Sequence, residues 1–95
     1  MILKLAYSEN STKLAQNLKD YLVNYPLLKF ESYDEQTMSE RKKAFGLKGE
    51  WGAKLTPFAI LIDDELDKPL IGFYSENNGC TFEKIIDALS NYIIY

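Results

Sequence analysis

The sequence predicts an α/β domain in which helices cover both faces of a mixed four-stranded β-sheet. Short apolar segments that suit buried strands alternate with segments whose apolar residues recur at helical spacing. The last two strand segments are joined by a short acidic turn, which favours an antiparallel hairpin. The 95 residues are 46% hydrophobic, which is enough for the core of one domain over residues 1–95.

The N-terminal third predicts a strand, a helix and a second strand. Residues 2–7 are apolar and β-compatible, and residues 27–33 alternate apolar and polar side chains. Between them a stripe of apolar residues has the spacing of one helix face. Asn10 or Ser11 would cap this helix, and Pro26 would end it, because the residue before a proline disfavours helical backbone. The stripe consists of Leu14, Leu18, Tyr21, Leu22 and Tyr25.

The middle of the chain predicts a short helix followed by a loop. Thr37 and Glu40 have the spacing of a capping box, so a second helix is expected over about residues 38–45. Residues 46–52 contain three glycines and predict a loop around Trp51.

The C-terminal third predicts a β-hairpin and a last helix. Residues 58–62 and 70–74 are strand segments on either side of an acidic turn. Thr81 would cap the final helix, whose apolar stripe consists of Phe82, Ile85, Ile86, Leu89 and Ile93. The order is then β-α-β-α-β-β-α. Strands joined through a helix favour a parallel crossover, and the hairpin adds an antiparallel strand.

The composition excludes several kinds of site. There is no histidine and a single cysteine, Cys80, so the chain offers no internal disulfide, no zinc site built on thiolates and no histidine general base. The net charge of −3 is too small to indicate a polyanion or a membrane as partner. One unpaired thiol, with no leader-like or membrane-spanning apolar segment, predicts a cytoplasmic protein without a metal.

Three short motifs lie at the ends of predicted elements. Ser8-Glu9-Asn10-Ser11 follows the first strand, Thr56-Pro57 precedes the third, and Gly79-Cys80-Thr81 opens the last helix. In this order they resemble the thioredoxin-like superfamily, most closely the glutaredoxins. That family places Cys-x-x-Cys, a cis-proline and a glutathione-binding Gly-Cys stretch at these three points. The resemblance covers essentially the whole chain and implies a three-layer α/β/α fold with a cis peptide bond before Pro57.

The departures from the family pattern decide the chemistry that is expected. Ser8 and Ser11 stand where the family has its cysteines, and a serine hydroxyl neither ionises near neutral pH nor exchanges with sulfur. The residues before the motif, 5–7, include no basic side chain for the glycine carboxylate of glutathione. Phe82 stands where glutaredoxins have an aspartate after the Gly-Cys stretch. The resemblance therefore implies a thioredoxin-like scaffold without its dithiol.

Each candidate residue also has a purely structural interpretation. Ser8 and Ser11 either line a binding cleft or only cap the first helix. Thr56 either offers its backbone to an extended peptide or belongs to a conformational lock at the proline. Cys80 is either a monothiol nucleophile, with its pKa lowered at a helix N-terminus, or a half-buried turn residue. Trp51 is either an exposed interface residue, with Tyr7 and Tyr74 nearby, or a lid over the core.

Two charged segments are expected to be solvated surface. The basic residues of the middle segment would bind nucleic-acid phosphate only in a strongly salt-dependent manner, and a solvated helix face explains them more simply. The acidic residues after residue 62 lack the spacing of a calcium loop and indicate a hairpin turn. The two sets are Arg41, Lys42, Lys43, Lys48 and Lys54, and Asp63, Asp64, Glu65 and Asp67.

The sequence therefore predicts a non-catalytic thioredoxin-like binding or adaptor protein, a monomer or weak homodimer, whose partner is a protein segment. Members of the superfamily without the cysteines occur as adaptors and in compact genomes such as those of phage, which the resemblance extends to this chain. The alternative is a glutathione-linked monothiol oxidoreductase or transferase that uses Cys80. The expected binding residues are Tyr7, Ser8, Ser11, Trp51, Thr56, Pro57, Gly79, Cys80 and Thr81.

Overall fold

Four strands form one mixed sheet in the computed structural model, which describes residues 1–92. The strands are β1 (Ile2–Tyr7), β2 (Lys29–Asp34), β3 (Phe58–Asp63) and β4 (Lys68–Tyr74), in the order β2-β1-β3-β4 across the sheet. β1 runs parallel to β2 and antiparallel to β3, and β3 runs antiparallel to β4. The prediction of a mixed four-stranded sheet with a terminal hairpin is confirmed.

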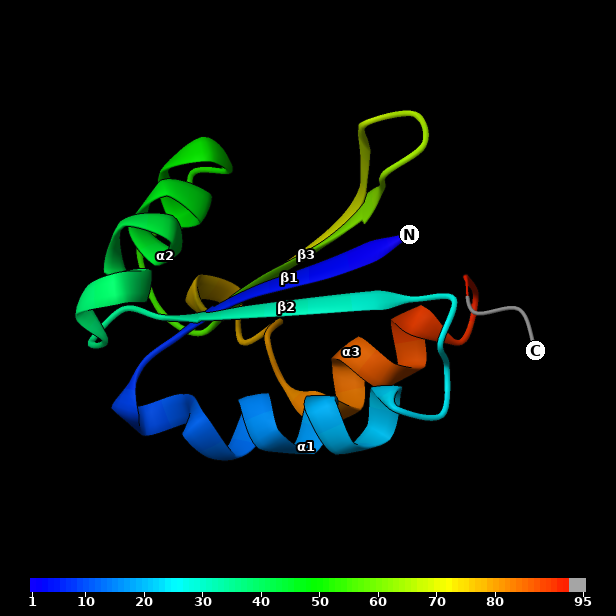
Figure 1. The fold of residues 1–95 in the computed structure, drawn as a ribbon, viewed down its shortest axis with the longest axis horizontal. Helices are drawn as coiled ribbons and strands as arrows, with labels where there is room; N and C mark the ends of the chain where they lie inside the picture. Colours follow the sequence, from blue (N-terminus) through cyan, green and yellow to red (C-terminus); the bar gives the residue numbers. More distant parts are fainter. Residues whose placement is uncertain (93–95) are drawn as a thin grey trace.

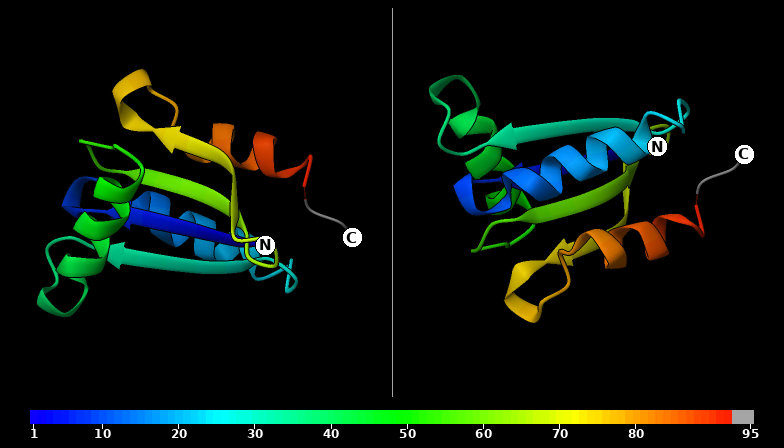
Figure 2. Two further views of the ribbon diagram at one scale, coloured as in Figure 1. Left: turned by 90° about the horizontal axis from the view of Figure 1, so that it is seen from above. Right: turned by 90° about the horizontal axis from the view of Figure 1, so that it is seen from below.

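Three helices cover the sheet on its two faces. α1 (Thr12–Leu22) and α3 (Phe82–Leu89) lie side by side on one face, and α2 (Met38–Glu50) lies on the other (Figures 1 and 2). Two short 3-10 helices, Glu9–Ser11 and Ser75–Asn77, precede α1 and the segment leading to α3. None of the helices in residues 1–92 has the length and apolarity needed to cross a membrane.

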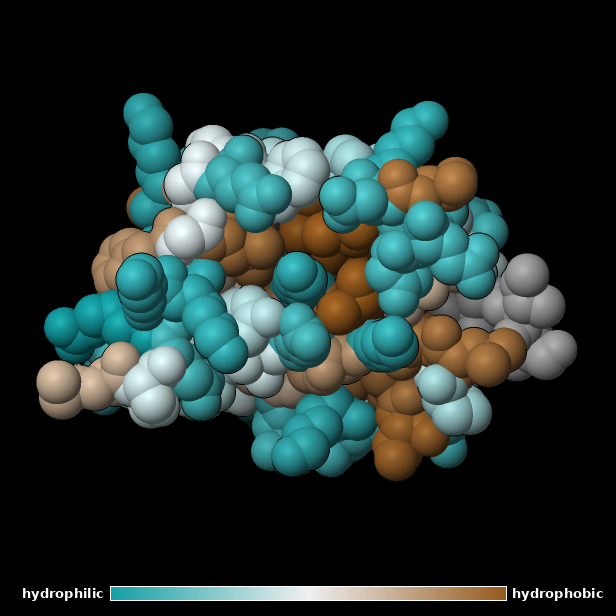
Figure 3. Space-filling model, turned by 45° about the horizontal axis from the view of Figure 1, so that its top comes forward, coloured by the Kyte–Doolittle hydropathy of each residue, from teal (hydrophilic) through white to brown (hydrophobic). Residues whose placement is uncertain are grey.

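The central strands β1 and β3 are buried on both faces, because their side chains alternate between two apolar clusters. Leu3 and Leu5 point toward α1 and α3, where they pack with Leu18 and Ile85. Their neighbours in β1 and β3 pack with α2 on the other face; this second cluster comprises Ile2, Ala6, Ala44, Leu47, Ala53, Phe58, Ile60 and Ile62. Figure 3 shows apolar surface in the middle of the α2 side, framed by hydrophilic side chains.

The second helix is longer than the sequence predicted. α2 continues through Gly46 and Gly49 to Glu50, so the predicted loop over residues 46–52 is wrong, and Trp51 is the residue that ends the helix. A glycine inside a helix costs about 1 kcal/mol relative to alanine. Burial of the helix against β1 and β2 outweighs this cost, and the chain turns only at Gly52, where φ is +73°.

Other element ends differ from the prediction by a few residues. α1 ends at Leu22, before Tyr25 and Pro26, and β2 begins at Lys29 because a turn occupies the two preceding residues. β4 begins at Lys68 and contains Pro69.

The predicted cap of the last helix is confirmed. The Thr81 hydroxyl accepts a hydrogen bond from the Lys84 backbone N–H at 3.3 Å. Ile93, predicted as part of the apolar stripe, lies outside the described residues.

Candidate functional site

The Ser8–Ser11 turn lies directly beside the segment that contains Pro57. The Ser8 and Thr56 hydroxyl oxygens are 3.0 Å apart, although the residues are separated by 48 positions in the sequence. The Thr56–Pro57 peptide bond is cis. The end of β1 and the start of β3 thus bring the first two sequence motifs together.

The two serines also stabilise their own turn. The Ser8 backbone N–H donates to the Ser11 hydroxyl at 3.0 Å, and the Ser11 N–H donates to the Ser8 carbonyl at 3.0 Å. Ser8 donates from its hydroxyl to the Asn10 side-chain oxygen at 2.6 Å. Ser11 occupies the N-cap position of α1, but no cap hydrogen bond from its side chain to the helix is present; its hydroxyl bonds back to Ser8 instead.

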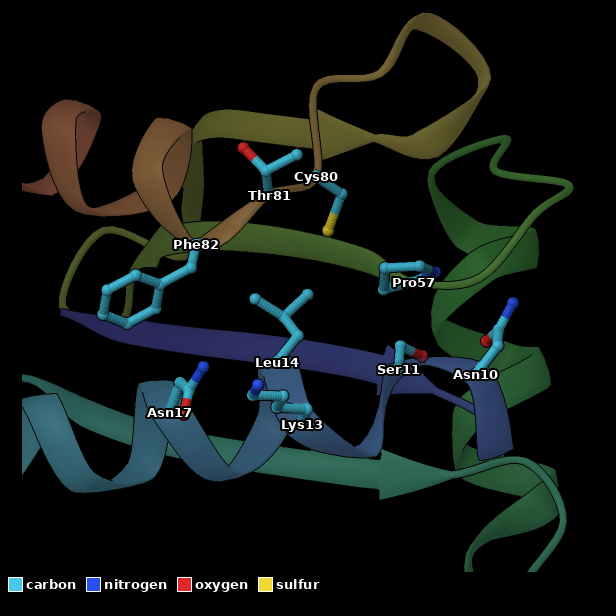
Figure 4. A pocket seen from close by; sticks show the side chains of 9 residues that line it. All are labelled: Asn10, Ser11, Lys13, Leu14, Asn17, Pro57, Cys80, Thr81 and Phe82. Atoms are coloured by element: carbon cyan, nitrogen blue, oxygen red, sulfur yellow. The ribbon is translucent and has the colours of Figure 1, made fainter.

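A groove of about 290 Å³ lies between the start of α1, Pro57 and the start of α3. Figure 4 shows side chains from these three segments facing one another across it, with the Cys80 sulfur directed toward the groove. Its lining combines apolar and polar side chains; they are Asn10, Ser11, Lys13, Leu14, Asn17, Pro57, Cys80, Thr81 and Phe82. The groove therefore includes residues of all three sequence motifs.

Cys80 is buried, and its thiol resists ionisation. Only 6% of the residue is exposed. Burial raises the pKa of the thiol from its ordinary value of 9.0 to about 12, and a backbone hydrogen bond from Ala59 opposes this shift only in part. The expectation that the helix N-terminus lowers this pKa is wrong, because removal from water disfavours the thiolate more than the helix terminus favours it.

A thiol probe should therefore react with Cys80 very slowly in the folded protein. At pH 8 we expect the rate with an aromatic disulfide reagent to be at least about a hundredfold below that in denaturant, since both the thiolate fraction and the access are reduced. The rate should rise with pH up to about 12, the pKa of the folded thiol. A rate at pH 8 that matches the unfolded chain would contradict the assignment of Cys80 as a buried, inert thiol.

A largely buried ion pair between Lys48 and Glu35 holds the side chain of Thr56. The Thr56 hydroxyl donates to Glu35 Oε1 at 3.2 Å, and Lys48 Nζ donates to Glu35 Oε2 at 2.9 Å. The exposed fractions of the Lys48 and Glu35 side chains are 8% and 18%. The sequence suggested that Lys48 belongs to a solvated basic face, and this prediction is wrong because the side chain is buried. The chain Lys48–Glu35–Thr56–Ser8 links α2 to the serine turn.

Trp51 is placed over the core on the α2 side, away from the groove. Its ring packs against the cluster that contains Phe58, and its backbone carbonyl accepts a hydrogen bond from the Tyr74 hydroxyl at 2.7 Å. The indole Nε1 is buried and has no hydrogen-bond partner. Trp51 is half-buried and lines no part of the groove, which agrees with the lid interpretation.

Two further predicted site residues lie near the groove without lining it. Tyr7 ends β1, and burial, with the charges of Asp34 and Glu40, raises its pKa. Gly79 has space for no side chain, because a Cβ would come within 2.6 Å of the Asn77 side-chain oxygen. Of the predicted set, the groove is lined by Ser11, Pro57, Cys80 and Thr81. Ser8 and Thr56 do not line it, but they contact each other in the two segments that carry Ser11 and Pro57.

The acidic turn is a hairpin connection, as predicted. The Asp63 carboxylate accepts backbone hydrogen bonds from Glu65 and Leu66, and Asp64 forms an ion pair with the N-terminal amine at 2.9 Å. Within residues 1–92, no group of three or more acidic, cysteine or histidine side chains is arranged to hold a metal ion.

Sequence reasoning did not identify Glu35, Asn10 or Phe82 as members of this site. Glu35 follows β2 and shows no motif, and its role depends on contacts across 13 and 21 residues of sequence. Asn10 and Phe82 adjoin motif residues, so their proximity could have indicated them. Comparison with known proteins adds no assignment: no family model, no curated protein and no solved structure matches the chain.

Proposed function

We propose that this chain is a thioredoxin-like binding protein without a redox dithiol, and that it holds an extended protein segment in the groove between α1, Pro57 and α3. The observation that carries the proposal is the convergence of three segments, distant in sequence, on one open groove. Ligand-binding sites in general combine apolar surface with a few placed polar groups. Leu14 and Phe82 supply the former, and Asn10, Lys13 and Thr81 supply the latter.

Binding without catalysis follows from the chemistry of the groove. The hydroxyl groups of Ser11 and Thr81 in the groove, and that of Ser8 in the adjoining turn, cannot exchange with a disulfide, and no histidine exists to activate them. Its thiol, Cys80, has a pKa of about 12 and is therefore protonated at neutral pH. This observation disfavours the alternative, in which Cys80 acts with glutathione as a monothiol oxidoreductase or transferase.

The proposal can be tested by selection of peptides from a random linear library on the immobilised protein. We expect selected peptides to bind the unmodified chain and to lose at least about tenfold in affinity, or 1.4 kcal/mol, on Asn17→Arg, which places a long charged side chain at the groove. Gln16→Arg is the matched control, because Gln16 is exposed on the same helix and does not line the groove. Equal affinity for both variants would locate binding elsewhere.

The same protein should be assayed with glutathione and a mixed-disulfide substrate. We expect no reduction above the buffer rate. Glutathione-dependent reduction that disappears in Cys80→Ala would replace the binding proposal by the enzymatic alternative.

A further inference from the structure

We infer that the outer edge of β2 pairs antiparallel with the same edge of a second copy of this chain, with Phe30 opposite Phe30 of the second copy. β2 is an outermost strand of the sheet, next to β1 alone (Figure 2, left), and no other described strand pairs with it. The inference concerns a surface other than the groove and does not depend on the proposed function.

The open backbone of this edge is short and well defined. Lys29 N–H donates to the Met1 carbonyl at 3.0 Å and Glu35 N–H to the Tyr7 carbonyl at 2.9 Å, so the odd-numbered residues of β2 face β1. Because this direction alternates in a parallel ladder, Phe30 and Ser32 turn their N–H and C=O groups outward.

The N–H groups on either side of this open pair are already bound. Asp34 N–H donates to Glu40 Oε1 at 2.9 Å, and Leu28 N–H donates to the Tyr25 carbonyl at 3.0 Å. A partner strand therefore meets an edge whose outward N–H donors are those of Phe30 and Ser32. Such a length suits a single short strand and limits indefinite edge-to-edge growth.

The charges on the edge select one register. Opposite residues of an antiparallel pair point to the same face, so only registers that match even with even residues keep the two sheets aligned. With Phe30 opposite Phe30, Lys29 lies opposite Glu31 of the second copy, and symmetry provides this ion pair twice. With Phe30 opposite Ser32, Glu31 would face Glu31, and like charges directly opposite are destabilising.

The chosen register pairs three of the four open backbone groups of each copy. The Phe30 N–H of each copy donates to the Phe30 carbonyl of the other, and each Ser32 N–H donates to the opposite Leu28 carbonyl. The Ser32 carbonyl stays unpaired, because the Leu28 N–H opposite it is bound to the Tyr25 carbonyl. Phe30 opposite Ser32 would pair all four groups, but only with Glu31 against Glu31. Ser32 opposite Ser32 would set Phe30 against Asp34, whose N–H is bound to Glu40, and would lose both Lys29–Glu31 ion pairs.

Lys29 and Glu31 are both exposed in the single chain, and Lys29 contacts Asp64 only at 3.4 Å. Glu31 Oε1 accepts a hydrogen bond from the Tyr33 hydroxyl at 2.6 Å, so Oε2 is the oxygen that would meet Lys29.

Burial of the apolar surface beside the edge would further stabilise the paired dimer. A groove of about 400 Å³ runs along β2 and α1, and it is lined by Lys19, Leu22, Val23, Leu28, Phe30 and Ser32. Val23 in this lining is 76% exposed, and Leu27, which precedes the lining residue Leu28, is 81% exposed. Figure 3 shows apolar side chains at the lower right, where the chain passes from α1 to β2 in Figure 1. A second copy would cover this surface on both chains.

The opposite edge of the sheet is less suited to pairing. β4 contains Pro69, which has no N–H to donate, and its ladder with β3 is irregular between Leu61 and Ile62. Natural edge strands are protected by such features. β2 has neither a proline nor an irregularity over its six residues.

Charge reversal at the edge tests the inference in the full chain. Sedimentation velocity over a concentration series should show reversible self-association, weakened about tenfold by Lys29→Glu and by Glu31→Lys, because each change sets two like-charged pairs opposite. The double variant Lys29→Glu/Glu31→Lys should recover the parent affinity within about threefold. Lys42→Glu on the exposed face of α2 is the control for net charge. A parent protein that stays monomeric up to millimolar concentration overturns the inference, as does association that is indifferent to these changes.

Single cysteines determine the register independently. Under mild oxidation Phe30→Cys should give a disulfide-linked dimer, because position 30 meets itself across the twofold axis. Cross-linking mainly through Glu31→Cys or Ser32→Cys would overturn the register, and cross-linking mainly through Lys68→Cys would move the interface to β4. The parent chain is the background control, since Cys80 is buried. Circular dichroism of each variant confirms that it is folded before the comparison is made.

Discussion

Replacement of Lys48 by methionine is expected to destabilise the folded chain by about 2–3 kcal/mol, because it removes one partner of a buried ion pair. Loss of one partner from a buried ion pair typically costs about 3–5 kcal/mol, because the other charge is left without compensation. The value is reduced here because 18% of the Glu35 side chain remains exposed and water can solvate it in part. Urea unfolding followed by circular dichroism measures the change.

Two further variants distinguish loss of the ion pair from the general effect of replacing a lysine in α2 by methionine. Lys42→Met makes the same change at an exposed position of α2 and should stay within about 0.5 kcal/mol of the parent. The double variant Glu35→Gln/Lys48→Met should recover part of the loss, because the glutamine is neutral and its oxygen still accepts the Thr56 hydroxyl. If Lys48→Met and Lys42→Met had the same free energy of unfolding, the Lys48–Glu35 ion pair would not stabilise the folded chain.

The ion pair also has a consequence for the groove. Glu35 holds the Thr56 hydroxyl, and Thr56 contacts the Ser8 hydroxyl at 3.0 Å, so the pair positions the wall that carries Pro57. Amide hydrogen exchange at Ser8 should therefore become faster in Lys48→Met than global destabilisation alone requires. Exchange of the α3 amides provides the reference, since that helix lies on the opposite face of the sheet from α2, which carries Lys48 (Figures 1 and 2).

The architecture was predictable because its signals are local and repeated. Leu3 and Leu5 alternate with residues of the other face along β1, and Phe82, Ile85 and Leu89 recur at helical spacing in α3. Such patterns follow from the geometry of strands and helices alone. The proximity of Ser8 to Thr56 was also expected, but only through the resemblance, because nothing local connects two residues 48 positions apart.

The features that the sequence did not indicate depend on tertiary contacts. Gly46 and Gly49 predict a loop from their propensity, yet packing of Ala44 and Leu47 against the sheet keeps them in α2. Lys48 belongs to a run of basic residues that suggests a solvated face, and its pairing with Glu35, 13 positions earlier, is a tertiary contact with no local signal. For Cys80, burial by the surrounding core decides the direction of the pKa shift, and burial of one side chain has no signature in a single sequence.

Replacement of Ser8 and Ser11 by cysteine is expected to create a disulfide. In Ser8→Cys/Ser11→Cys the two thiols would occupy positions whose groups already touch, since the Ser8 N–H donates to the Ser11 hydroxyl at 3.0 Å and both residues belong to one tight turn. Both positions are less than a tenth exposed, so the disulfide would form within the chain rather than between chains. Thiol titration and mass spectrometry after treatment with oxidised glutathione measure its formation.

The oxidised double variant should also acquire catalytic thiol–disulfide exchange that the parent lacks. Residue 8 differs from Cys80, which is buried in the apolar cluster, because the Thr56 hydroxyl lies 3.0 Å from the residue 8 side chain and can donate to a thiolate there. This donor and the backbone N–H groups at the start of α1 favour the thiolate and offset the cost of its burial. Reduction of insulin by dithiothreitol should then be accelerated by the double variant and by neither single variant, because only a neighbouring thiol resolves the mixed disulfide. Ser11→Cys/Ser32→Cys is the matched control, with the second thiol on β2. If the Ser8→Cys/Ser11→Cys thiols stayed reduced in oxidised glutathione, the turn would not hold the geometry of a dithiol site. The thioredoxin-like interpretation of the groove would then be wrong.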